Sequence, residues 1–287
     1  MKVQGCDCTI VIKTDYREFD VPYSEETIRE DVTLLIEEAS IEGDGLHRAI
    51  QKRGGATGCV VTPLTIGTVD HLLYLAMGSA GTMEFVTGTR NIYKYCIEML
   101  PMEDTGGFDL IQDRNGERIV YEACRVKDFE LRINREEALK LKLDVCGNRP
   151  PTIYPYTDYF QRESGELFNG DNVKYKINGK EYPNIYGLTI GVKKENGTKT
   201  EVWIKRILEN ENDLPDYINE IEITAQLVRD KFENKYNGIF RITIKKLVLQ
   251  SDETNINSSD TVIGPLRYYV LDTILAEVFT SGDGGIP

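Results

Sequence analysis

The sequence contains very little histidine. Its 287 residues include two, His47 and His71, so a mechanism that needs an imidazole base has few candidates. Neither histidine lies in a recognisable catalytic motif, and the sequence has no Gly-x-Ser-x-Gly nucleophile elbow. We interpret both as surface or helix-end packing residues and predict that the protein has no catalytic residue and is not an enzyme.

Long hydrophobic runs are also missing. The first residues lack the apolar stretch of a signal peptide, and nowhere does the chain approach the roughly 18 apolar residues of a membrane-spanning helix. We expect no secretion signal and no membrane association. The six cysteines then predict reduced thiols rather than a disulfide scaffold, with synthesis in a reducing cytoplasm.

Positive charge is scarce. Lys and Arg number 34 against 47 Asp and Glu, which gives a net charge of -13 and an isoelectric point near 4.8. Such a field repels phosphate backbones. The basic residues form no run longer than the pairs Lys193-Lys194 and Lys245-Lys246, so the sequence predicts no tight nucleic-acid-binding surface.

Ligand-binding motifs are equally scarce. Cys6-Asp7-Cys8 has no further Cys or His at zinc spacing, and the stretch from Asp252 to Asp260 lacks the glycine and terminal glutamate of a calcium loop. Gly54-Gly55-Ala56-Thr57-Gly58 lacks the ending of a phosphate-binding loop, and we interpret it as a flexible surface loop. The sequence therefore predicts no cofactor and no metal.

What the chain does have is globular composition, with 40% hydrophobic and 28% charged residues. Its length fits one large domain or two modest ones. The proline-rich segment after Gly147 is the candidate boundary, so we consider a single domain over 1–287 or two similar halves, about 1–147 and 148–287. The segment from Asn148 to Tyr182 reads as loop with short strands.

Hairpin signals recur along the chain. Asn-Gly dipeptides, which suit type I′ turns, occur at Asn115-Gly116, Asn169-Gly170, Asn178-Gly179, Asn196-Gly197 and Asn237-Gly238. Apolar and polar residues alternate beside them, as in Leu139 to Val145, Leu188 to Val192, Val202 to Ile204, Ile221 to Leu227 and Phe240 to Ile244. The pattern predicts half-buried antiparallel strands.

Two irregular strands are predicted as well. Between Tyr121 and Ile133 the apolar positions shift from even to odd numbers, which needs one extra residue near Lys127 or Asp128, so we place a β-bulge there. The run from Leu266 to Phe279 is apolar on both faces and predicts one long strand that is covered on both sides.

Two helices are readable. Ser24 can cap a first, whose apolar stripe includes Ile28, Val32, Leu35, Ile36 and Ala39. Thr68 can cap a second, from Val69 to Met77, with Gly78 as its left-handed stop.

A family resemblance rests on these elements. The stretch from Tyr121 to Gly147 resembles the bulged strand and hairpin partner in the wall of bacteriophage tail tube proteins. The order that follows is similar too: Gly165-Glu166-Leu167-Phe168, the Asn178-Gly179 turn, the hairpin from Tyr186 to Leu208, and a closing strand after Gly264-Pro265-Leu266. Upstream, Pro63 to Gly67 leading into Leu72 to Gly78 resembles the segment that precedes the tube strands.

The resemblance implies a mainly β protein, an antiparallel β-sandwich or barrel of the tail tube type with a flanking α-helix and long loops. It further implies homo-oligomeric rings, usually hexameric, that stack into a tube in the virion tail, assembled in the host cytoplasm beside other tail proteins. DNA would pass through transiently without adhering, because an acidic lumen repels phosphates. Our candidates for lumen or ring-surface residues are Asp128, Glu130, Glu220 and Glu222.

Two alternatives stay open. A β-sandwich could bind carbohydrate or a receptor on a virion or cell surface through Tyr154, Tyr156, Tyr159 and Phe160. A hydrolase could use two carboxylates in a groove of the sandwich. In the structural reading, the loops from Gly43 to Gly58 and from Asn148 to Tyr182 would contact neighbouring subunits.

Overall fold

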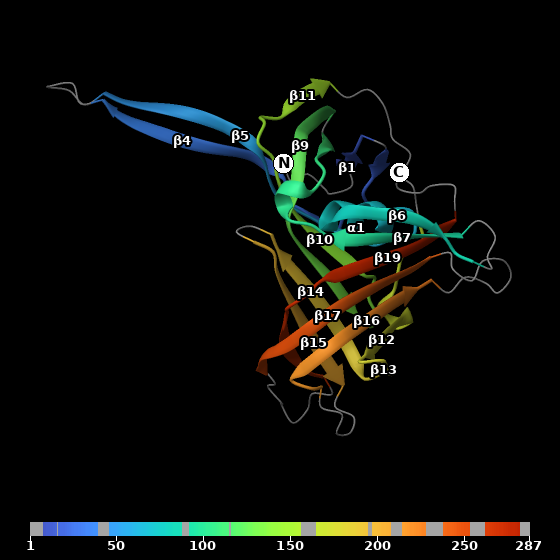
Figure 1. Ribbon diagram of the computed structural model, residues 1–287. Helices are drawn as coiled ribbons and strands as arrows, with labels where there is room; N and C mark the ends of the chain where they lie inside the picture. The colour runs from blue at the N-terminus through green and yellow to red at the C-terminus, as the bar shows by residue number, and fades with distance from the viewer. Residues whose placement is uncertain are drawn as a thin grey trace.

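The computed structural model describes most of the chain. The described residues are 8–15, 17–39, 46–87, 92–114, 116–155, 165–194, 197–207, 214–227, 238–252 and 262–281. This part is mainly β, as the sequence predicts. Its antiparallel strands form a sheet that folds over itself into two layers without closing into a barrel (Figure 1).

The first layer, layer I, has the strand order β5, β10, β9, β14, β15, β18. These strands are β5 (Leu46–Pro63), β10 (Lys140–Cys146), β9 (Glu117–Asn134), β14 (Ile185–Lys193), β15 (Lys199–Ile207) and β18 (Val262–Val270). Its outer strand β5 also pairs with β3 (Glu25–Glu26) and β4 (Arg29–Ala39). Because β9 pairs with β14, one sheet includes strands from both 1–147 and 148–287.

The second layer, layer II, has the order β12, β16, β17, β19, β7, β6. These strands are β12 (Val173–Ile177), β16 (Tyr217–Gln226), β17 (Ile239–Asp252), β19 (Ile274–Ser281), β7 (Ile92–Met99) and β6 (Gly78–Phe85), and β12 also pairs with β13 (Lys180–Glu181). The first part of β17 pairs with β19 and its last part with β18, so β17 joins the layers. Strands of the two layers cross in Figure 1.

The core lies between the layers because strand alternation turns every second side chain inward. Leu131, Ile190 and Ile204 of layer I, and Ile223 and Phe240 of layer II, are at most 1% exposed. Burial of one such side chain contributes about 1.5–3 kcal/mol. The shared core therefore holds the two layers together.

Helix α1 (Val69–Met77) is present where the sequence predicts it, and it packs against β6, β7, β9 and β19. All of its residues except Tyr74 are buried. Gly78 ends the helix with a φ of 110°, and its N–H donates to the Tyr74 carbonyl, which confirms the predicted stop. Thr68 occupies the N-cap position, but its hydroxyl contacts Thr65 Oγ1 at 2.8 Å and does not cap the helix.

A smaller sheet adjoins the sandwich and shares β9 with it. Its order is β2 (Glu18–Asp20), β1 (Cys8–Lys13), β8 (Phe108–Arg114), β9 and β11 (Thr152–Pro155). The predicted bulge is confirmed, because Asp144 pairs with Asp128 and Val145 with Val126, which leaves Lys127 as the extra residue. Two short 3₁₀-helices, η2 (Met102–Asp104) and η3 (Gly170–Asn172), lie in the connections.

Several Asn-Gly hairpins are confirmed. Asn178-Gly179 separates β12 from β13, and the strands on either side of the predicted turns at 115–116 and 196–197 pair as β8 with β9 and β14 with β15. Asn115 and Asn196 themselves lie outside the described residues. Asn178 and Gly179 both have positive φ, as a type I′ turn requires. The hairpin expected at Asn169-Gly170 is wrong, because Asn169 is extended and its side chain accepts a hydrogen bond at the start of η3.

The helix predicted from Ser24 to Ala39 is also wrong. The segment forms β3 and β4, which pair with β5. Its apolar residues fit helical spacing, but β-branched residues such as Ile28 and Val32 also favour strands. Pairing with β5 decides in favour of strands over a helix. The pattern of a single segment cannot show this pairing.

The apolar run from Leu266 to Phe279 forms two strands rather than one. β18 ends at Val270, β19 begins at Ile274, and Leu271 between them is 63% exposed. Tyr269 is 36% exposed, so β18 is not covered on both faces. The chain turns between the two strands because β18 pairs with the last part of β17, whereas β19 pairs with the first part.

Candidate functional site

The most prominent feature outside the sandwich is a long hairpin. Residues 32–39 of β4 pair with residues 46–53 of β5, and we call these residues the arm. Figure 1 shows the arm extending away from the rest of the molecule as a ribbon of two strands. Eight residues of strand span roughly 26 Å. A two-stranded ribbon has no core of its own and is marginally stable in water, so the arm has the form of a segment that binds another surface.

The base of the arm is firmly attached to layer I. The Arg53 guanidinium donates two hydrogen bonds to the Glu30 carboxylate, at 2.5 and 2.7 Å. Gly55 lies so close to Gly147 that a Cβ there would be 2.0 Å from the Gly147 carbonyl oxygen. The flexible loop expected at Gly54 to Gly58 is therefore wrong, because these glycines belong to β5 and permit close backbone contact.

The four lumen candidates lie on two different surfaces. Asp128 and Glu130 are on the outer side of β9 in layer I, whereas Glu220 and Glu222 are on the outer side of β16 in layer II. Asp128 accepts a hydrogen bond from the Lys194 backbone N–H at 3.0 Å, and Glu130 pairs with Arg132. The structure does not bring these residues into one acidic cluster, and their role in a lumen stays a prediction.

An ion-pair ladder crosses the outer face of layer II. Adjacent members carry opposite charges and lie 2.9 to 3.6 Å apart. The members, in order across the strands, are Lys176, Glu222, Arg241, Glu277, Lys94 and Glu84. The ladder compensates the charge of Glu222, so this face presents paired charges rather than free carboxylates.

His71 has structural partners. Its ring is buried in the first turn of α1, stacks on Phe19 at 5.2 Å, and has Nε2 3.0 Å from Nη1 of Arg17. A guanidinium can only donate, so Nε2 is the acceptor in this contact. Burial raises the pKa of the neighbouring Asp70, whose carboxylate accepts from the His71 backbone N–H. The group fastens the start of β2 to α1, which is helix-end packing; the His47 side chain lies outside the described part.

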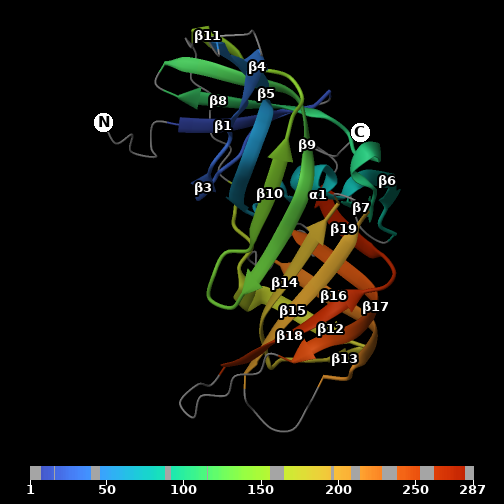
Figure 2. The same cartoon turned by 90° about the vertical axis from the view of Figure 1, so that its left-hand side faces the viewer.

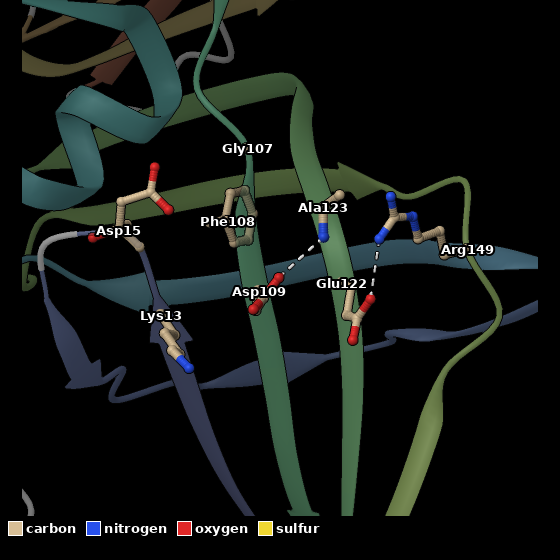
Figure 3. A pocket seen from close by; sticks show the side chains of 9 residues that line it. Lys13, Asp15, Gly107, Phe108, Asp109, Glu122, Ala123 and Arg149 are labelled. Atoms are coloured by element: carbon tan, nitrogen blue, oxygen red, sulfur yellow. Dashed lines mark hydrogen bonds and ion pairs between the residues drawn. The ribbon is translucent and has the colours of Figure 1, made fainter.

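A shallow polar pocket of about 430 Å³ opens where β9 leaves the smaller sheet (Figure 3). Its charged lining residues are Lys13, Asp15, Asp109, Glu122 and Arg149. Asp109 accepts from the Ala123 backbone N–H at 3.1 Å, and Glu122 pairs with Arg149 at 3.2 Å. These two carboxylates are engaged in holding the second irregularity of β9, where Ala123 has a φ of 51°. The pocket thus has a structural explanation.

Of the aromatic cluster considered for ligand binding, Tyr154 is described. It lies on β11, at the edge of the smaller sheet, and is 48% exposed beside Ile153, which is 54% exposed. Tyr156, Tyr159 and Phe160 lie outside the described residues. Because the two residues are consecutive in a strand, their side chains point to opposite faces of the smaller sheet and do not form one site.

Cys59, Cys96, Cys124 and Cys146, all in the described part, are thiols rather than members of a disulfide. Burial raises the pKa of Cys124 to about 12. Within the described ranges, no group of three His, Cys, Asp or Glu side chains is placed to hold a metal ion. The part of the chain that the structure covers also contains no helix with the length and hydrophobicity needed to span a bilayer.

Comparison with protein-family models and with curated proteins gives no match. A functional interpretation of this chain therefore depends on its own geometry, above all on the arm and on the outer faces of the two layers.

Proposed function

We propose that this chain is the structural subunit of a phage tail tube. Copies form rings, usually of six, and the rings stack into a hollow conduit for the genome during ejection. The protein works in the virion tail, beside other tail proteins, without catalysis or a cofactor.

The architecture supports the proposal. The resemblance implies an antiparallel β-sandwich with a flanking helix, and the described chain has two crossed layers with α1 against them. The stretch expected to form wall strands, Tyr121 to Gly147, contains the bulged strand β9 and its hairpin partner β10. The net charge of -13 favours passage of DNA without adhesion, because like charges repel over a Debye length of about 8 Å at physiological salt.

The arm is the observation that carries the proposal. Within the described ranges its strands pair only with each other, so their outer backbone edges have no strand partner among the described residues. Exposed strand edges readily pair with another chain. A subunit that assembles by reaching onto its neighbour needs such an extension, whereas an isolated monomeric sandwich does not.

Electron microscopy and sedimentation test the proposal on the full chain at physiological salt and high concentration. We expect rings or hollow tubes. The matched variant replaces residues 34–51 by Asn-Gly, which closes a two-residue turn on the Thr33–Lys52 pair. It should keep the circular dichroism of the sandwich but fail to form tubes. A wild-type chain that stays monomeric at every concentration would refute the proposal.

A second candidate function is carbohydrate or receptor binding. The exposed side chain of Tyr154 favours it, since an exposed ring at a sheet edge can stack on a sugar. Glycan-array binding that is lost in Tyr154→Ala, in a chain that never assembles, would support this alternative over the tail tube.

A further inference from the structure

The outer face of layer I gathers basic residues that are far apart in the sequence. Outward positions from β10 to β18 carry Lys140, Lys142, Arg132, Lys193, Lys199, Lys205 and Arg267. The same face carries the acidic residues Asp128, Glu130, Asp144 and Glu201. Among the described residues this face thus carries seven basic and four acidic side chains, whereas the full sequence has 34 basic and 47 acidic residues. The described part of this acidic chain therefore has a locally positive face.

Three lysines on this face are available for a partner. Arg132 pairs with Glu130, Lys142 with Asp144 at 3.1 Å, and Arg267 with Glu201 at 2.6 Å. Lys193, Lys199 and Lys205 are exposed, and none of them forms an ion pair with a described residue. Lys193 and Lys199 are directly opposite each other on β14 and β15. Two adjacent like charges destabilise the free face slightly. Asp128 of β9 lies opposite Lys193 on its other side, and a carboxylate from a partner would compensate the second charge.

Aromatic side chains lie next to these lysines. Trp203 covers Gly191, where a Cβ would be 2.7 Å from its ring. The Arg267 guanidinium is 5.7 Å from the Trp203 ring centre and 5.9 Å from that of Tyr269. These aromatic side chains form a row that continues across the next strands. Tyr269 pairs with Val248, and Val248 pairs with Tyr217, which is 47% exposed. Trp, Tyr and Arg are the residues that dominate binding energy at protein interfaces.

The charge pattern distinguishes between classes of partner. A phosphate backbone laid across this face would meet the carboxylates of Asp128, Glu130 and Asp144 between the lysines. A protein surface can place its own charges to match both signs, and it can cover the aromatic row. An acidic protein is therefore the partner that fits.

We propose that the outer face of layer I, from β10 to β18, is a contact surface for an acidic surface of a second copy of this chain. The chain is itself such a partner, because over its full sequence acidic residues exceed basic ones by 13, with 47 against 34. The two surfaces in contact differ, so the association is head-to-tail and builds either a closed ring or a filament. This inference rests on the assembly proposed above and identifies one of its surfaces.

A pair of charge-reversal variants tests the proposal. Lys193→Glu/Lys199→Glu changes the proposed contact surface, and Lys174→Glu/Lys245→Glu makes the same charge change at exposed sites on layer II. Sedimentation velocity gives the protein concentration at which half of the molecules are assembled. We expect at least a tenfold rise for the first variant and less than a threefold rise for the second. If the wild-type chain assembles, but the two variants change this concentration equally or not at all, this inference is overturned. The proposed function would still stand.

The single tryptophan provides a test without substitution. The chain has one Trp, and it is Trp203, in the middle of the proposed surface. Its fluorescence maximum should move to shorter wavelength as the protein is concentrated through the assembly range, because the indole loses water. An unchanged maximum during assembly would refute contact at this face, whereas absence of assembly would refute the proposed function as well.

Discussion

The sandwich and the arm are made of the same antiparallel pairing, but their surroundings differ. Each strand of layers I and II has one face in a common core, where residues such as Ile204 and Phe240 are fully buried. The arm strands β4 and β5 pair with each other beyond the body, as Figure 1 shows from the side. In Figure 2 the arm points toward the viewer. Backbone hydrogen bonds alone contribute little net stability, so the comparison separates a self-sufficient fold from an extension that needs a partner.

The largest expected effect lies in the core. Phe240 meets Phe168 edge-to-face at 4.9 Å and joins layer II to the segment before η3. Phe240→Ala should lower the free energy of unfolding by about 3–5 kcal/mol, measured by chemical denaturation. Phe85→Ala is the control, because Phe85 is 54% exposed, and it should change stability by less than about 0.5 kcal/mol. Equal losses would contradict the assignment of a common core.

A smaller effect is expected where the arm joins the body. In Gly55→Ala the new Cβ would lie 2.0 Å from the Gly147 carbonyl oxygen, so the backbones of β5 and residue 147 must separate. We expect a loss of about 1–3 kcal/mol in the same denaturation measurement. Gly107→Ala is the matched control, because its nearest neighbour would be 3.8 Å away. If both variants lose the same stability, close backbone contact at the base of the arm is not the reason that position 55 requires glycine.

Local signals explain which parts of this fold the sequence predicts. The Asn178-Gly179 turn, the bulge at Lys127 and the Gly78 helix stop each depend on a few adjacent residues, and all three are confirmed. The arm was missed because its β4 half fits a helical stripe. The Gly43-Asp44-Gly45 turn signal between two segments of similar length is the feature that could have indicated a hairpin.

The basic face of layer I could not be predicted from sequence alone. Lys142, Lys193 and Lys199 share one surface only because β10, β9, β14 and β15 are neighbours in the sheet. A run of adjacent Lys and Arg residues does not indicate such a face, because adjacent residues of a strand point to opposite sides of the sheet. Strand order is a long-range property, and it decides the charge of each face.

A pH-dependent effect of intermediate size is expected from Lys194 in the body. The side chain is 3% exposed, with Nζ 3.5 Å from the Met77 carbonyl oxygen at the end of α1, and burial lowers the pKa of its ammonium to about 8. An unfolded lysine titrates near 10.4. Between these values the unfolded chain binds more protons, so the stability of the folded chain rises with pH.

Comparison with Lys194→Met isolates this contribution. The wild type should gain about 2–3 kcal/mol relative to the variant between pH 7.5 and 10.5, measured by urea denaturation at each pH. Methionine keeps the backbone N–H that donates to Asp128 and fills a similar volume. Parallel pH profiles for the two chains would show that Lys194 is solvated, and that the end of α1 is less enclosed than the rest of the core.

The smallest effect on stability is expected from removal of the arm. With residues 34–51 replaced by Asn-Gly, the core, α1 and the Glu30–Arg53 pair are all retained. The free energy of unfolding should change by less than about 0.5 kcal/mol, the range of surface changes that touch no core residue. Urea denaturation of the monomer at low concentration measures it. A loss above about 1 kcal/mol would mean that the arm belongs to the cooperative unit of the monomer, and its form would then no longer require a second copy.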